Sequence, residues 1–101
     1  MIKVKVERKE NFIKQIKITG HAKYDEYGKD IVCAGVSSAL ITTVNACLLF
    51  DQNSIEYNEE NDFKLVNISE NNITNKLLEN LYNVLTDLEK NYKKNIQIKE
   101  D

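Results

Sequence analysis

The sequence has few of the residues on which several protein classes depend. It contains two cysteines, one histidine and a single arginine in 101 residues. Two cysteines and one histidine are too few for a closed tetrahedral zinc site unless carboxylates join, so we expect no structural metal and no cofactor. One arginine leaves almost no bidentate reader of phosphate or guanine. With a net charge of -2, nucleic acid is not expected as the primary partner.

Long apolar runs are also missing. No segment approaches the roughly 18 consecutive apolar residues that a membrane span needs, and the opening MIKVKVERK lacks the apolar region of a signal peptide. We therefore expect a cytoplasmic protein that makes no membrane contact and keeps its two thiols reduced. A composition of 42% hydrophobic and 30% charged residues is typical of a globular protein. The length allows one domain, residues 1–101, with a single site.

Alternating patterns predict the strands. Residues 2–7 alternate between apolar and charged side chains, and a second run at 12–19 follows a polar turn at 8–11, which together predict a hairpin. Residues 54–57 and 63–68 predict a second hairpin, and residues 96–98 a short closing strand. The apolar side of the second strand is expected to hold Phe12, Ile16 and Ile18.

Helical spacing marks two longer segments. Residues 31–50 predict a long, largely buried helix, and residues 73–92 an amphipathic helix with Asn71 or Asn72 as its N-cap. The expected buried positions are Val32, Val36, Leu40, Val44 and Cys47 in the first helix, and Ile73, Leu77, Leu81, Leu85, Leu88 and Tyr92 in the second. The predicted fold is α+β: two β-hairpins and a C-terminal strand form a mainly antiparallel sheet packed against two helices.

The connection between the second strand and the first helix is long by the usual standard of about 2 to 6 residues, which is typical of functional loops. It contains the only histidine, His21, and leads to Cys33. Asp30 directly precedes the apolar helical run, as an N-cap does, and this places Cys33 in the first turn. There the helix dipole favours the thiolate, and unpaired backbone N–H groups can stabilise an oxyanion.

These residues suggest a Cys–His dyad. His21 follows Gly20 at the strand end and is the candidate base, with Asp25, Glu26, Asp30 or no residue as a third partner. Taken singly, a cysteine on an apolar helix is more often a buried hydrophobic residue, and a histidine near a turn is more often solvated. We interpret Cys47, deep in the same helix, as core. Gly20, Gly28, Tyr24, Tyr27 and Ser37 have equally ordinary interpretations as turn, surface and helix residues.

The segments Gly20-His21-Ala22 and Gly28-Lys29-Asp30-Ile31-Val32-Cys33-Ala34-Gly35-Val36-Ser37 together resemble the ribosomal-processing cysteine protease family called Prp. The resemblance implies a cytosolic endopeptidase. Such an enzyme removes the N-terminal extension of a large-subunit ribosomal protein, of the L-twenty-seven family, and cleaves after an aromatic pair.

The same resemblance assigns roles to individual residues. Cys33 is the nucleophile and His21 the base, and Gly20, Gly28, Asp30 and Ser37 shape the site. Tyr24 and Tyr27 fall in the variable substrate loop, and the resemblance also implies a homodimer. Two other interpretations stay open. One is a non-catalytic module that binds a ribosomal protein, and the other is a thiol redox sensor that uses the same helix-capped cysteine.

Overall fold

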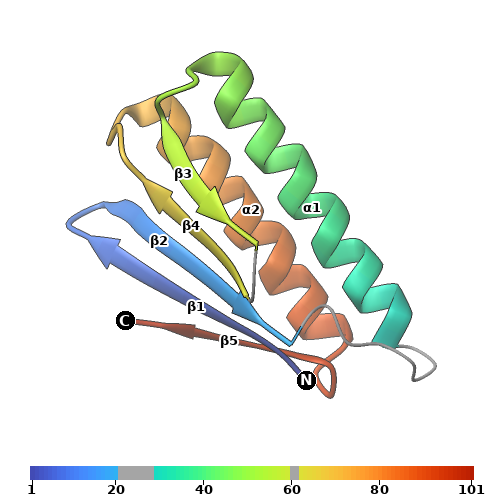
Figure 1. Cartoon of the computed structure of the whole chain (residues 1–101). Helices are drawn as coiled ribbons and strands as arrows, with labels where there is room; N and C mark the ends of the chain where they lie inside the picture. Colours follow the sequence, from blue (N-terminus) through green and yellow to red (C-terminus); the bar gives the residue numbers. More distant parts are fainter. Residues whose placement is uncertain (21–28, 60–61) are drawn as a thin grey trace.

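The computed structural model describes residues 1–20, 29–59 and 62–101, with only the backbone at 29 and 30. It shows a five-stranded sheet with two helices covering one face (Figure 1). The elements are β1 (Ile2–Lys9), β2 (Phe12–Thr19), α1 (Lys29–Phe50), β3 (Ile55–Asn58), β4 (Phe63–Asn67), α2 (Asn72–Asn91) and β5 (Ile96–Glu100). The strand order is β3-β4-β2-β1-β5; β1 and β5 pair in parallel and the other neighbours antiparallel. The predicted α+β class is confirmed.

A β-bulge changes the register of the first hairpin. Glu7 lies opposite Gln15, but the next residue, Arg8, lies opposite Ile13, so Lys14 is an extra residue in β2. An extra residue reverses which side chains point inward beyond it. Ile13 is therefore fully buried in place of Phe12, which is half-buried, and the prediction for Phe12 was wrong. The turn is also shorter than predicted, because β1 continues to Lys9.

The helices bury most of the positions that their spacing predicts. All five expected residues of α1, from Val32 to Cys47, lie in the core. In α2, Asn71 is the N-cap, since its side chain accepts a hydrogen bond of 2.7 Å from the Thr74 N–H. Ile73 is 50% exposed, contrary to the prediction, and Thr74 and Leu78 are buried instead. At 100° per residue, Thr74 and Leu78 share a face with Leu81, whereas Ile73 turns away from it.

One segment passes a membrane-span criterion that we did not expect any segment to meet. Ile31–Phe50 of α1 is long and apolar enough to cross a membrane by length and composition alone, with a mean hydropathy of 1.8. Its serine, threonine and asparagine residues interrupt the apolar run but lower the mean only slightly. In the structure 39% of this segment is buried, and that inward side packs on the sheet and on α2. The core helix of a globular domain has the same composition.

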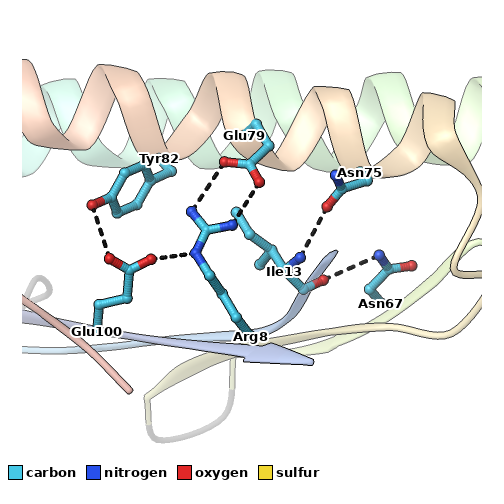
Figure 2. A network of polar contacts seen from close by, with 7 residues as sticks. All are labelled: Arg8, Ile13, Asn67, Asn75, Glu79, Tyr82 and Glu100. Atoms are coloured by element: carbon cyan, nitrogen blue, oxygen red, sulfur yellow. Dashed lines mark hydrogen bonds and ion pairs between the residues drawn. The ribbon is translucent and has the colours of Figure 1, made fainter. Parts of the chain in front are cut away.

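A polar network joins the end of β1 to α2 and β5 (Figure 2). The Arg8 guanidinium donates hydrogen bonds of 2.6 and 3.1 Å to the two carboxylate oxygens of Glu79 on α2, and its Nε donates to Glu100 on β5. These hydrogen bonds to Glu79 and Glu100 raise the pKa of Arg8. The Arg8 Cζ also lies 5.3 Å from the ring centroid of Tyr82. The single arginine, which the sequence placed in a turn, therefore fastens a helix to two strands.

We expect Arg8→Met to lower the free energy of unfolding by about 1 to 2 kcal/mol, because two carboxylates lose a charged hydrogen-bond donor that is only 26% exposed. The neighbouring Lys9→Met is the control. The Lys9 Nζ is 3.8 Å from the Glu70 carboxylate and the lysine side chain is 64% exposed, so its loss should change stability by less than about 0.5 kcal/mol. Urea denaturation of both variants measures the difference, and equal losses would contradict this role for Arg8.

Candidate active site

The helix that carries Cys33 begins earlier than its apolar run indicates. It starts at Lys29, which makes Asp30 its second residue and Cys33 its fifth. The expectation that Asp30 precedes the helix as an N-cap was therefore wrong. Cys33 lies just beyond the first turn of 3.6 residues, where the backbone N–H groups already have partners inside the helix. The unpaired N–H groups belong to the residues before Cys33, so any oxyanion donors on α1 lie one turn towards its start.

The two thiols of the chain lie in different environments. Cys33 is partly buried and packs against the edge of the hydrophobic core, whereas Cys47 is 0% exposed inside it. Loss of solvation raises the pKa of Cys47, which disfavours its thiolate. Fourteen residues of helix hold the two about 21 Å apart along the axis, too far for a disulfide. Cys33 is therefore the thiol that a reagent or substrate can reach.

Two further residues of α1 lie close to Cys33 in the helix. Ser37 is one turn later on the same side, since residues four apart lie above one another, and it is also half-buried. Gly35 packs against Leu88 of α2, where an added Cβ would meet both Leu88 methyl carbons at 3.6 Å. This contact fixes the first half of α1 against α2. From the sequence, Leu88 was predicted only as part of the apolar stripe of α2, because its contact with Gly35 exists only in the folded chain.

Gly20 ends β2 in a conformation that requires glycine. Its φ is +79°, and a Cβ built there would lie 2.5 Å from the Met1 carbonyl oxygen. Both the left-handed backbone and the close backbone oxygen exclude a side chain. Glycine is therefore required where β2 ends, and the role of Gly20 in shaping the site stays a prediction.

We expect Gly20→Ala to lower the free energy of unfolding by at least about 2 kcal/mol, because a Cβ at this φ strains the backbone and displaces Met1. Gly35→Ala is the matched control. Gly35 lies inside a helix with ordinary contact distances around it, so alanine there should stabilise by about 0.5 to 1 kcal/mol. Thermal unfolding of the pair tests this, and a Gly20→Ala variant as stable as Gly35→Ala would show that Gly20 is not required.

The remaining predicted site residues lie outside the described residues. These are His21, Tyr24, Tyr27 and Gly28, together with Asp25 and Glu26 and the side chain of Asp30. The approach of His21 to Cys33 therefore stays a prediction. Within residues 1–20, 31–59 and 62–101, no cluster of three or more His, Cys, Asp or Glu side chains is placed to hold a metal ion.

Comparison with known proteins matches this arrangement to one family. Residues 1–97 match the family described as "Cysteine protease Prp". The "Ribosomal processing cysteine protease Prp" of Staphylococcus aureus is 33% identical over 93 residues, which cover 88% of each chain. The protein of the same name from Bacillus subtilis is 43% identical over 37 residues, 37% of this chain and 33% of that protein.

Solved structures agree with the sequence match. A crystal structure of the S. aureus protease Prp with a substrate peptide superposes on this chain with a TM-score of 0.92, 27% identity and full coverage of both chains. Another, with a covalently linked product peptide, gives a TM-score of 0.82 and 29% identity, again with full coverage. The fold and its accessible helical cysteine are those of a cysteine protease. Within that class, the chain belongs to the Prp family.

Proposed function

We propose that this protease removes the N-terminal extension of a large-subunit ribosomal protein, of the L-twenty-seven family, and cuts after an aromatic pair. Cys33 is the nucleophile and His21 the base. The motif around both residues, the family match over residues 1–97 and the relatives named for ribosomal processing support this assignment. The same names support a cytoplasmic location.

The observation that carries the proposal is the accessibility of Cys33 in a fold that a peptide-bound protease shares. The S. aureus relative has been crystallised with a covalently linked product peptide. A covalent link to peptide is what a nucleophilic side chain forms during acyl transfer. Of the two thiols in this chain, Cys47 is sealed in the core, so Cys33 is the one that a peptide can reach.

The chemistry follows from the two roles. The Cys33 Sγ attacks the scissile carbonyl carbon while the imidazole of His21 takes the thiol proton. The tetrahedral intermediate then collapses, the C–N bond breaks, and the imidazolium gives its proton to the leaving amine. Water attacks the thioester with His21 again as base, which releases the carboxylic acid and restores the thiol. Unpaired N–H groups at the start of α1 are candidate donors to the oxyanion.

The test is to incubate the protein with a ribosomal-protein precursor that carries its N-terminal extension, and then to measure the masses of the protease and of the precursor. We expect two products whose masses add up to the precursor plus one water, with the cut after the aromatic pair. A stable complex without cleavage would favour the non-catalytic binding module. Oxidation of Cys33 by low peroxide with no proteolysis would favour the redox sensor, and either result would overturn the proposal.

We also propose that the chain forms a homodimer, as its family resemblance implies. The outward side of α1 supports this, because it carries no charged residue from Ile31 to Phe50 and leaves Ile41 57% and Leu49 88% exposed. Large exposed apolar patches of this kind mark interaction sites. Sedimentation of the wild type against Ile41→Lys tests it: the wild type is expected to sediment as a dimer and the variant as a monomer, and a monomeric wild type would overturn the proposal.

A further inference from the structure

Four lysines form a straight row across the face of the sheet that the helices leave open. The strand registers place Lys5 of β1 directly beside Lys99 of β5 and Lys17 of β2, and Lys17 directly beside Lys64 of β4. All four are exposed, and Lys3 of β1 adds a fifth charge on the same face. Strands lie about 4.8 Å apart, so the row is about 14 Å long.

Repulsion between the lysines of this row destabilises the folded state, and few ion pairs offset it. Like charges directly opposite one another on neighbouring strands are destabilising. Within the described part of the chain, one of these lysines has a carboxylate partner: the Lys5 Nζ lies 3.5 Å from the Asp101 carboxylate, and both side chains are more than half exposed. Exposed pairs of this kind contribute little. A row of like charges that the fold itself disfavours indicates a ligand of opposite charge.

The surface is also hollowed at the row. A cavity of about 230 Å³ is lined by Lys3, Lys5, Lys17 and Lys99, together with Val4, Thr19 and Gln97. The lysines that line it come from three neighbouring strands, β2, β1 and β5. An anionic group seated there can therefore meet several ammonium groups at once, which raises the local potential well above that of isolated surface lysines.

We propose that this open face binds the phosphate backbone of RNA without reading its sequence. Lysines about 4.8 Å apart along about 14 Å can contact several successive phosphates of one strand. Lysine is a point charge suited to phosphate contact, and the chain has no second arginine for bidentate base recognition. The row itself contains no aromatic side chain on which a base can stack; Phe12, which the bulge turns towards the open face, is half-buried and lies opposite Lys9, outside the row.

The row lies near the proposed active site, so RNA bound to it is held close to that site. This step rests on the proposed function. Lys17 precedes His21 by four residues, and Thr19, which lines the cavity, is the last residue of β2. The end of β2 and the start of α1 lie at the same end of the molecule (Figure 1). A protease that acts on a ribosomal protein meets RNA as the nearest anionic polymer. A net charge of -2 gives no general attraction to RNA, so contact depends on local cationic clusters such as this row.

The test is fluorescence anisotropy with a labelled oligouridine of 12 nucleotides. Lys17→Gln/Lys64→Gln removes two lysines of the row, and Lys76→Gln/Lys90→Gln removes two exposed lysines of α2, so both variants change the net charge from -2 to -4. We expect the sheet variant to weaken binding about tenfold at low salt and to reduce the salt slope, log K against log salt, by about 1.4. The α2 variant should bind within about twofold of the wild type.

Three results would overturn the proposal. They are no binding by the wild type at 50 mM salt, equal losses in the two variants, and tighter binding of a 12-residue oligoglutamate than of the RNA, which would assign the face to an acidic peptide. The sheet variant should unfold at the same or a higher temperature than the wild type, because two like charges on directly paired residues have been removed. The assay requires no proteolysis, so its failure is distinct from a failure of the proposed cleavage.

Discussion

The Cys33→Ala variant is expected to cleave the extended ribosomal precursor at least about 1,000-fold more slowly than the wild type, because removal of the nucleophile leaves only binding and oxyanion stabilisation. Its fold should survive. Cys33 is partly exposed at the edge of the core, so loss of its sulfur removes few packing contacts. Cleavage is followed by mass spectrometry, and stability by thermal unfolding of the same preparation.

Cys47→Ala is the matched control, and it is expected to lower stability but leave cleavage unchanged. Cys47 is fully buried, so this change should cost about 1 kcal/mol of stability through the cavity it leaves, while cleavage per folded molecule stays at the wild-type rate. His21→Ala should lose cleavage as Cys33→Ala does. If either Cys33→Ala or His21→Ala cuts the precursor at close to the wild-type rate, the assignment of the dyad is wrong.

Iodoacetamide is expected to label Cys33 at least about 1,000-fold faster than Cys47 at neutral pH. Cys47 has no exposed surface, and burial raises its pKa, so both access and ionisation oppose its reaction. In the native state it reacts only when the domain opens, and a stability of about 5 kcal/mol limits the open fraction to below about one in a thousand. Timed quenching and peptide mass mapping give both rates.

Denaturation supplies the control for this labelling experiment. In concentrated urea the two thiols are equally solvated, and their rates should agree within a small factor. Raising the pH alone should leave Cys47 slow to react while the domain stays folded, since the barrier at Cys47 is access as well as ionisation. Equal native rates would mean that the part of α1 around Cys47 opens readily, and faster labelling of Cys47 would remove the argument for Cys33 as the reactive thiol.

The elements with strong periodicity were predictable because their burial repeats within a few residues. The buried side of α1 and the choice of Asn71 or Asn72 as cap followed from local spacing alone. The bulge opposite Glu7 and Arg8 had no such signal. It depends on how two strands pair, and it moved Ile13 into the core in place of Phe12. The start of α1 at Lys29 was missed because its first two residues are polar.

The candidate site was predicted through its motif, and the structure adds what a motif does not contain. Gly20 was identified as an element of the family motif, but the reason for glycine there, the Met1 carbonyl oxygen that a Cβ would meet, joins residues that only the folded sheet brings together. The same holds for the lysine row. Lys3 and Lys5 alternate visibly along β1, whereas the alignment of Lys99, Lys17 and Lys64 beside them depends on three registers across four strands.

The contact between Met1 and Gly20 has a practical consequence for recombinant work. An affinity tag fused ahead of Met1 would emerge beside the glycine from which the chain leaves β2, only one residue before His21. A peptide linker placed there would lie beside the end of β2, next in sequence to the proposed base. Purification handles are better attached after Asp101, whose backbone amide is bonded to the Val6 carbonyl oxygen in the sheet, at 2.9 Å.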